Sequence, residues 1–279
     1  MKESYAKVDD IKICYNEYGK GHPVILIHGI GGKKETWIAQ IDSLKKHFRV
    51  VTFDLRGVGK SDRPDMPYTM ELLANDVKGL MDYLKIDSAH IIGRSLGGMI
   101  AQYFTLKYPE KVDKLVLMTT NPRVPDEQGA ELIKKGRLEE IKQLKEDPEK
   151  SFWKKARILF HKDFRKAMKQ NSEKKFHDIF SARDLIEEST VNPSRPQDIE
   201  NLSNTLRSHD IIDKIHNISN QTLLISGSHD RLTPESSMME IQKRIPHSTI
   251  EVIQKTGHFL HLSRAPEVNR LLIDFLTQD

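Results

Sequence analysis

Cysteine is almost absent from this sequence, since Cys14 is the only one in 279 residues. A single cysteine excludes a disulfide within the chain, which fits a protein of a reducing compartment. The amino-terminal stretch MKESYAKVDDIKI also lacks the apolar segment of a secretory signal. Together these two absences predict a cytoplasmic protein.

Long apolar runs are missing as well, and a membrane-spanning helix needs about 20 such residues. Hydrophobic residues make up 37% and charged residues 30% of the chain, as in a folded globular protein. The net charge is only +4, and lysine and glutamate intermingle in stretches such as KKGRLEEIKQLKEDPEK. We therefore expect neither a membrane nor a nucleic acid as a partner. The sequence leaves open whether the chain is a monomer or a homodimer.

Nucleotide-binding signals are incomplete. The segment DLRGVGKS ends like a phosphate-binding P-loop, but Asp54 stands where the first glycine is required. A carboxylate there would repel a phosphate, and Pro64 and Pro67 follow where a helix should begin. Gly29 and Gly31 likewise lack the third glycine of a dinucleotide-binding motif. No nucleotide cofactor is expected.

Short apolar runs and amphipathic segments alternate along most of the chain. The runs PVILI, RVVTF and AHIIG, each followed by helical spacing, predict parallel strands covered by helices on both faces. An alternating segment with Asp9 and Asp10 at its middle predicts an antiparallel hairpin at the sheet edge. Residues 122–215 lack this rhythm and carry helical stretches. We expect a core of residues 1–121 and 216–279 with a helical insertion between them.

A candidate nucleophile lies between a predicted strand and a predicted helix. Ligand sites of parallel sheets gather at the carboxyl ends of the strands. There the segment GRSLGG places Ser95 in the context of a nucleophile elbow. The glycines around Ser95 let strand and helix approach while the turn projects the hydroxyl. Ser95 is therefore the predicted nucleophile, and the alternative is that it only caps the helix.

A serine hydroxyl needs a base, and the base needs a carboxylate to orient it. His258 directly follows the last predicted strand and a glycine, which favours it over His261. Asp230 follows the strand QTLLISG, and Thr233 is expected to cap the next helix. The order serine, aspartate, histidine is typical of enzymes with a nucleophile elbow. Asp230 and His258 are therefore the predicted partners of the serine.

An oxyanion hole requires backbone N–H groups aimed at the substrate carbonyl oxygen. We expect the amide of Leu96, directly after the nucleophile, to be one donor. The amide of Ile30 in the loop HGIGG is expected to be the other. Gly29 and Gly31 let this loop pass close to the substrate, and Trp37 follows nearby. These last three residues are predicted substrate contacts.

The ordered set HGIGG, DLRGVGKS, GRSLGG, GSHDRLTP and TGH resembles the α/β-hydrolase superfamily, in its esterase and lactonase branch. The resemblance implies an eight-stranded, mostly parallel sheet with helices on both faces and a helical cap inserted after the sixth strand. It also implies that DLRGVGKS is a structural loop and that no metal or organic cofactor is needed. Ser95 speaks against the epoxide-hydrolase and haloalkane-dehalogenase branches, which use an aspartate nucleophile.

One residue departs from the family pattern. Arg94 stands where relatives more often carry histidine, asparagine, glutamine or an aromatic residue. If its side chain lies beneath the elbow, it needs a carboxylate partner, because an unpaired buried charge is costly. If it points outward, it is neutral to catalysis.

The expected activity is that of a carboxylesterase for small or medium esters, acting through an acyl-enzyme. An enol-lactonase or a C–C bond hydrolase with the same three residues is the alternative, and a ligand-binding receptor with weak catalysis is a further one. Selectivity should reside in the cap, where Trp153 and five phenylalanines either line an acyl pocket or form the cap's own core. These phenylalanines are Phe152, Phe160, Phe164, Phe176 and Phe180.

Overall fold

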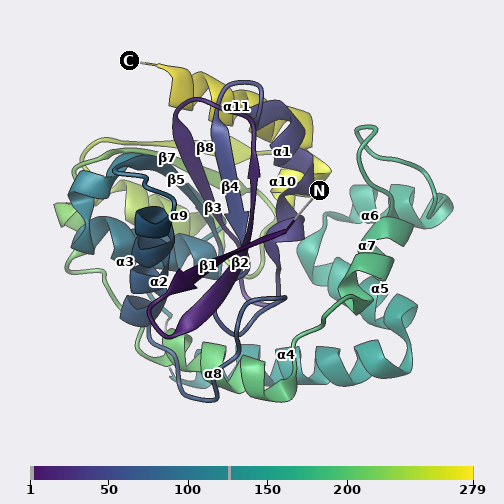
Figure 1. Ribbon diagram of the computed structural model, residues 1–279. Helices are drawn as coiled ribbons and strands as arrows, with labels where there is room; N and C mark the ends of the chain where they lie inside the picture. The colour runs from purple at the N-terminus through teal and green to yellow at the C-terminus, as the bar shows by residue number, and fades with distance from the viewer. Residues whose placement is uncertain (1–2, 125–126, 279) are drawn as a thin grey trace.

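An eight-stranded sheet forms the centre of the molecule (Figure 1). The structure is a computed structural model that describes residues 3–124 and 127–278. The strand order is β1-β2-β4-β3-β5-β6-β7-β8, with β1 and β2 antiparallel to their neighbours and the other pairs parallel. This confirms the predicted sheet and its edge hairpin. The strands are β1 (Ser4–Val8), β2 (Ile11–Tyr18), β3 (Pro23–Ile27), β4 (Arg49–Phe53), β5 (Ala89–Arg94), β6 (Val112–Met118), β7 (Gln221–Gly227) and β8 (Ser248–Ile253).

Helices cover both faces of the sheet (Figure 1). Successive strand residues point to opposite faces, so Ile25 and Ile27 enter one core while Val24 and Leu26 enter the other. Burial on both sides is why these strands read as unbroken apolar runs. On the first face pack α2 (Met70–Tyr83), α3 (Leu96–Lys107) and α9 (Glu235–Gln242); on the second, α1 (Ile38–Leu44), α10 (Leu260–Ser263) and α11 (Ala265–Thr277).

Helix α2 shows how local sequence and packing cooperate. Its N-cap Thr69 accepts a hydrogen bond from the amide of Leu72, which satisfies one of the free donors at the helix start. Leu73, Val77 and Leu80 recur at helical spacing and are fully buried against the sheet. Each such side chain contributes about 1.5–3 kcal/mol through burial, more than a cap does. Packing of this stripe therefore dominates the stability of the helix.

Five α-helices of the described chain lie between β6 and β7. In Figure 1, α4 and α8 run along the lower edge, and α5, α6 and α7 form a lobe at the right. The apolar cluster of the lobe includes Phe160, Met168 and Phe180, and it continues into the core through Ala39, Leu262 and Ala265. Helices were expected here, while the boundaries of core and cap stay a prediction. The five are α4 (Glu127–Glu146), α5 (Pro148–Leu159), α6 (Lys162–Gln170), α7 (Ala182–Thr190) and α8 (Pro196–Arg207).

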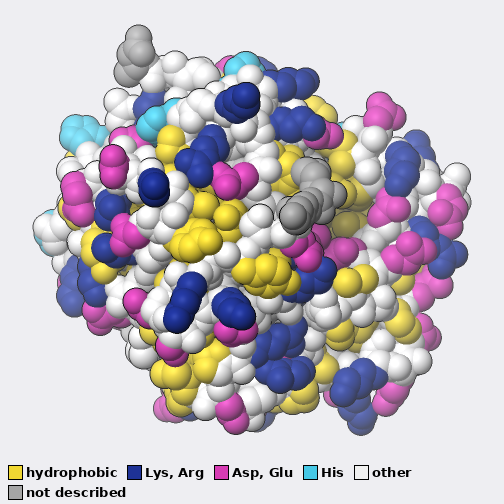
Figure 2. All heavy atoms as spheres, in the orientation of Figure 1, with side chains coloured by type: hydrophobic (Ala, Val, Ile, Leu, Met, Phe, Trp, Pro, Cys, Tyr) yellow, Lys and Arg dark blue, Asp and Glu magenta, His cyan; other side chains and the backbone are white. Residues whose placement is uncertain are grey.

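Charged side chains of both signs share the surface. Figure 2 shows Lys and Arg interspersed with Asp and Glu over the visible face, as the sequence pattern suggests. None of the helices in the described ranges combines the length and the apolar character that a bilayer crossing requires.

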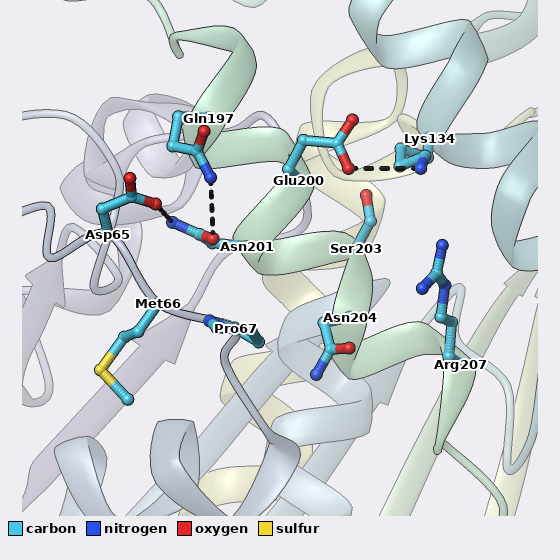
Figure 3. A pocket seen from close by; sticks show the side chains of 10 residues that line it. All are labelled: Asp65, Met66, Pro67, Lys134, Gln197, Glu200, Asn201, Ser203, Asn204 and Arg207. Carbon is cyan, nitrogen blue, oxygen red and sulfur yellow. Dashed lines mark hydrogen bonds and ion pairs between the residues drawn. The ribbon is translucent and has the colours of Figure 1, made fainter.

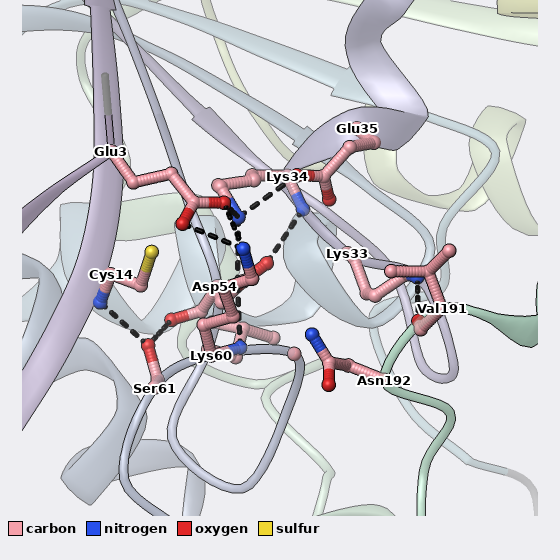
Figure 4. A network of polar contacts seen from close by, with 12 residues as sticks. Glu3, Cys14, Lys33, Lys34, Glu35, Asp54, Lys60, Ser61, Val191 and Asn192 are labelled. Carbon is pink, nitrogen blue, oxygen red and sulfur yellow. Dashed lines mark hydrogen bonds and ion pairs between the residues drawn. The ribbon is translucent and has the colours of Figure 1, made fainter. Parts of the chain in front are cut away.

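The DLRGVGKS segment is a loop organised around Asp54 (Figure 4). The buried carboxylate accepts hydrogen bonds from the amides of Lys34 and Lys60, each at 2.9 Å, and Lys34 Nζ lies 3.1 Å away. A Cβ at Gly59 would lie 2.3 Å from Asp54 Oδ2, so only glycine fits there. The Ser61 hydroxyl donates to the Asp54 carbonyl at 2.6 Å. The amides are thus bonded to a carboxylate, which confirms a structural loop and not a phosphate site.

Candidate active site

Ser95 occupies a sharp turn between β5 and α3. Its φ of 55° and ψ of −121° fall where residues with a side chain are rare, at a cost on the order of 1–3 kcal/mol. The Ser95 amide donates to the Met118 carbonyl at 3.0 Å, and the Thr120 hydroxyl donates to the Ser95 carbonyl at 2.8 Å. A Cβ at Gly97 would lie 2.0 Å from the Ile27 carbonyl oxygen. These neighbours hold the strained turn, whose geometry is typical of a nucleophile elbow.

The Ser95 side chain is not used as a helix cap. It makes no capping hydrogen bond to α3, although it stands at the N-cap position. Ser95 is half-buried, while the flanking Arg94 and Leu96 are buried. The geometry therefore favours the nucleophile reading over the capping alternative.

Asp230 and His258 form a buried pair. His258 Nδ1 lies 2.8 Å from Asp230 Oδ2. The Thr233 hydroxyl donates to the same oxygen at 2.6 Å, and Oδ1 accepts from the amides of Leu232 at 2.8 Å and Thr233 at 3.1 Å. Burial by itself raises the pKa of Asp230, but His258 and these donors outweigh it, so the pKa lies below its ordinary value. The carboxylate is ionised and faces Nδ1, which leaves Nε2 to exchange a proton.

Thr233 has a different role from the one predicted. Helix α9 has Pro234 at its N-cap position and no side-chain cap. The Thr233 hydroxyl donates to Asp230 instead, and it lies 3.3 Å from His258 Nδ1. The prediction of a Thr233 cap is wrong, because the buried carboxylate beside it needs hydrogen-bond donors.

His261 and Trp37 lie in the core. Both side chains are 0% exposed, and their rings pack with centroids 5.7 Å apart. Burial, together with the charges of Arg94 and His258, holds the pKa of His261 well below its ordinary value. Among the described residues no carboxylate pairs with His261, which agrees with the preference for His258. The indole of Trp37 is enclosed by apolar side chains, so the structure gives no support to its predicted contact with substrate.

The HGIGG loop is positioned by its own histidine, which sequence reasoning missed although it begins the motif. His28 Nε2 accepts a hydrogen bond from the Leu55 amide at 3.1 Å, so Nδ1 carries the proton and donates to the Gly29 carbonyl at 2.9 Å. Burial lowers the pKa of His28, which keeps the ring neutral. A Cβ at Gly29 would lie 3.0 Å from Ser95 Cβ. The structure thus brings Gly29 of this loop to the elbow, next to the predicted donor Ile30.

The inserted helix α4 reaches the same loop through Arg137. Its Nη2 donates to the Ile30 carbonyl at 3.0 Å. A Cβ at Gly31, whose φ is +65°, would lie 1.0 Å from that nitrogen, so Gly31 contacts Arg137 and not an open space. Glu140 pairs with Arg137 and with Lys155, each at 2.6 Å. Sequence reasoning missed Arg137 and Lys155, because they stand in lysine-rich helices without a distinguishing pattern.

The aromatic residues of the insertion pack mainly on one another. Trp153 donates to Glu149 at 3.2 Å, and Lys169 Nζ lies 5.2 Å from its ring centroid. Phe160 links the cluster to the site, with its ring 5.5 Å from that of Phe259. The arrangement supports the interpretation as a core of the insertion. The six residues in or against this cluster are Phe152, Trp153, Phe160, Phe164, Phe176 and Phe180.

A polar hollow of about 330 Å³ lies between the loop 65–67 and helices α4 and α8 (Figure 3). Its lining includes Lys134, Glu200 and Arg207, and none of the lining residues belongs to the site at Ser95. The hollow is therefore not the apolar acyl pocket considered from the sequence.

One group of described residues has the composition of a metal site. The candidate ligand atoms of His22, His90 and Asp113 lie within 4.8 Å of one another, and His22 Nε2 is 2.8 Å from Asp113 Oδ2. Burial lowers the pKa of His90 to about 4, so its ring is neutral. The group stands at the amino ends of β3, β5 and β6, opposite the end that carries Ser95. A cation there would take no part in chemistry at Ser95.

Known proteins are similar to this chain in sequence. Residues 22–265 match the family model of the alpha/beta hydrolase fold. A 2-hydroxy-6-oxononadienedioate/2-hydroxy-6-oxononatrienedioate hydrolase of Pseudomonas putida is 30% identical over 280 residues, 96% of this chain and 93% of that protein. A 2-hydroxy-6-oxo-6-phenylhexa-2,4-dienoate hydrolase of Comamonas testosteroni is 30% identical over 285 residues, 99% and 95% of the two chains.

Solved structures of known proteins are similar to this chain in fold. A meta-cleavage product hydrolase from Pseudomonas fluorescens IP01 is similar with a TM-score of 0.78 at 25% identity, over 98% of this chain and 97% of that one. The enol-lactonase from Burkholderia xenovorans LB400 is similar with a TM-score of 0.83 at 23% identity, over 99% and 100% of the chains, a likeness that shows the fold alone. With its sheet order, its elbow and these full-length relatives, the chain belongs to the α/β-hydrolase family.

Proposed function

We propose that this protein is a serine hydrolase that cleaves the carbon–carbon bond beside the ketone of a 2-hydroxy-6-oxo acid. The observation that carries the proposal is the 30% identity, over nearly the whole chain, to hydrolases named for such compounds. The carboxylesterase expected from the sequence becomes the second candidate, because the comparisons favour the C–C hydrolase alternative. Both reactions attack a carbonyl carbon and use the same residues.

Ser95 is the proposed nucleophile. As its hydroxyl oxygen attacks the ketone carbon, His258 takes the proton on Nε2, and the ionised Asp230 stabilises the resulting imidazolium. The amides of Ile30 and Leu96 are the proposed donors to the oxyanion, and losing one such donor costs about 3–4 kcal/mol of transition-state stabilisation. The strained turn supports this role because it presents the hydroxyl without a competing capping bond.

The products follow from the addition of one water. In the 2,6-dioxo tautomer of the substrate the carbon–carbon bond breaks, its electron pair is delocalised onto the 2-oxygen as an enolate, and His258 returns the proton to that fragment. Water, activated by His258, then attacks the acyl-enzyme and releases a carboxylic acid and free Ser95. The hydroxyl of the water molecule ends on the acyl carbon. The remaining proton of the water returns to Ser95 and replaces the proton that Ser95 gave to the leaving fragment, so atoms and charge balance.

The test uses 2-hydroxy-6-oxo-6-phenylhexa-2,4-dienoate, the compound in the name of the Comamonas testosteroni relative. We expect the wild type to convert it to benzoate, identified by mass spectrometry, and Ser95→Ala to be inactive. Ser236→Ala, an exposed serine in α9, is the matched control and should keep full turnover.

A panel of p-nitrophenyl esters separates the candidates. Turnover of the esters but not of the dienoate, lost in Ser95→Ala, would establish the carboxylesterase. Tight binding without turnover of either would favour the receptor. Turnover that persists in Ser95→Ala would refute the serine mechanism altogether.

A further inference from the structure

Arg94 is a buried guanidinium directly before Ser95. The residue is 2% exposed, and its Nε has no hydrogen-bond partner. Within residues 3–124 and 127–278, no carboxylate forms an ion pair with it. The guanidinium instead packs on an aromatic face, since Cζ lies 4.5 Å from the ring centroid of Phe259. A cation over an aromatic ring gains less free energy than the burial of an unpaired charge costs. The residue therefore lacks a partner that the energetics require.

The guanidinium lies beside the reacting groups. A Cβ placed on Gly29 would be 3.3 Å from Arg94 Nη2 and 3.0 Å from Ser95 Cβ, so both residues flank one point of the HGIGG loop. Phe259, which the guanidinium covers, directly follows His258. Arg94 thus touches the segments that carry the proposed nucleophile, base and oxyanion donors.

The two carboxylates nearest this point already have other partners. Glu140 is shared between Arg137 and Lys155, and Asp230 is already paired with His258. Burial lowers the pKa of Arg94 to about 9, with Asp230 opposing the shift and Arg137 adding to it, so Arg94 is still a cation at neutral pH. The site is therefore suited to an additional anion.

A purely structural role does not account for these observations. A structural arginine is normally bonded to carboxylates or carbonyls, as Arg56 is to Asp76 at 2.7 and 2.9 Å in this protein. Arg94 has no such bonds among the described residues. A methionine or glutamine would fill the same volume with a smaller desolvation cost.

We propose that Arg94 binds a carboxylate of the substrate, a few bonds from the carbonyl that Ser95 attacks. The inference deepens the proposed function and rests on it. A carboxylate can form two parallel charge-assisted hydrogen bonds to a guanidinium. Such a pair next to the elbow would hold the reacting carbonyl in register with the amides of Ile30 and Leu96. The substrate class is then a carbonyl compound that also carries a carboxylate, and neutral compounds of the same size are poor substrates.

The test compares mono-p-nitrophenyl adipate with p-nitrophenyl hexanoate, which share chain length and differ in a terminal carboxylate. We expect the wild type to have the higher kcat/KM for the adipate ester. Arg94→Gln should lower the ratio of the two kcat/KM values by about 10- to 100-fold, and Arg94→Lys should restore part of it. Arg270→Gln, at an exposed position in α11, removes the same charge and should leave the ratio unchanged. Equal losses on both esters would reveal a structural role and overturn the proposal.

Binding provides a readout that does not depend on turnover. Adipate should bind Ser95→Ala in calorimetry and should bind the double variant Ser95→Ala/Arg94→Gln at least tenfold more weakly. Adipate that binds through Arg94 in a protein without esterase or dienoate activity would reject the proposed function and keep the anion site. Turnover of the dienoate, with the same ratio of kcat/KM values in the wild type and in Arg94→Gln, would keep the proposed function and reject the anion site. If Arg94→Gln does not fold, inhibition of the wild-type enzyme is measured instead. Adipate should then inhibit ester hydrolysis, and the uncharged adipamide should not. Equal inhibition by both compounds would refute the anion site.

Discussion

His258 Nδ1 lies 2.8 Å from Asp230 Oδ2, and the two side chains are 4% and 0% exposed. At this distance an ionised carboxylate fixes the imidazole in one tautomer and stabilises it when Nε2 gains a proton. Asp230 is itself held by the amides of Leu232 and Thr233, so it cannot turn away from the ring. The pair is therefore preorganised for proton transfer before any substrate binds.

Asp230→Asn should leave a folded but crippled enzyme. The amide can donate to Nδ1 and so favours the wrong tautomer, and we expect kcat to fall by about 10⁴-fold. The measurement is kcat on the best substrate, with circular dichroism as the check on folding. Thr233→Val removes one donor and keeps the carboxylate, so its loss should stay within about tenfold. Nearly full activity in Asp230→Asn would show that another carboxylate orients His258 and stabilises its protonated ring.

Ser95→Gly should be more stable than Ser95→Ala, although both are inactive. Ser95 has a φ of 55°, which glycine adopts freely and alanine does not. Glycine removes about 1–3 kcal/mol of backbone strain at this position. This gain outweighs the cost of about 0.5–1 kcal/mol that comes from the greater chain entropy of glycine in the unfolded state. We expect a difference of about 1 kcal/mol in the free energy of unfolding, measured with denaturant. Equal stability of the two variants would mean that the elbow is not strained.

Two glycines should respond to alanine in opposite directions. A Cβ at Gly97 would lie 2.0 Å from the Ile27 carbonyl oxygen, and backbone cannot move aside. Gly97→Ala is therefore expected to cost about 3 kcal/mol or more. Gly136, inside α4, has nothing within 4 Å of its Cβ position, so Gly136→Ala should stabilise by about 0.5–1 kcal/mol. Thermal unfolding of both variants is the measurement, and a stable Gly97→Ala would contradict the close strand–helix approach.

Stability should fall between neutral pH and about pH 4. Burial lowers the pKa of His209 to about 4, although its hydrogen bond to the Asn121 carbonyl opposes the shift, and its Nδ1 has no partner. Below the ordinary pKa of 6.5 the unfolded chain binds a proton that the folded one does not, so stability is present above that pH and is lost as the pH falls toward 4. His209 alone should lower the free energy of unfolding by about 1–2 kcal/mol at pH 5 relative to pH 7.

The check on this effect is denaturant unfolding at pH 7 and pH 5. His209→Gln should reduce the pH-dependent loss, while His47→Gln, at an exposed position, should not. The same loss in wild type and His209→Gln would assign the acid sensitivity to other groups, such as the buried His90.

Elements with a strong local period could be predicted from the sequence. Apolar runs buried on both faces and amphipathic stretches that follow them specify strands and helices within a few residues, and β5 and α3 place Ser95 at their junction. Glycine requirements are also local, which is why GRSLGG indicated the elbow. The inserted helices α5 to α8 are also amphipathic, but their aromatic residues could be read as a pocket or as a core until the ring contacts were known.

Side-chain partners across long chain separations were decided only by tertiary structure. Trp37 is enclosed in the core, and Thr233 donates to Asp230 instead of capping a helix. Neither outcome has a local signature, because burial and pairing depend on which segments pack together.

The sequence by itself determined the fold family, the sheet with its edge hairpin, and the serine, aspartate and histidine that follow β5, β7 and β8. Only the tertiary structure decided that Arg137 of the insertion bonds to the HGIGG loop and that Arg94 is buried beside Ser95 without a carboxylate. The physical reason is that strand and helix periods are local properties of the chain, whereas the cost of a buried charge depends on every group that packs around it.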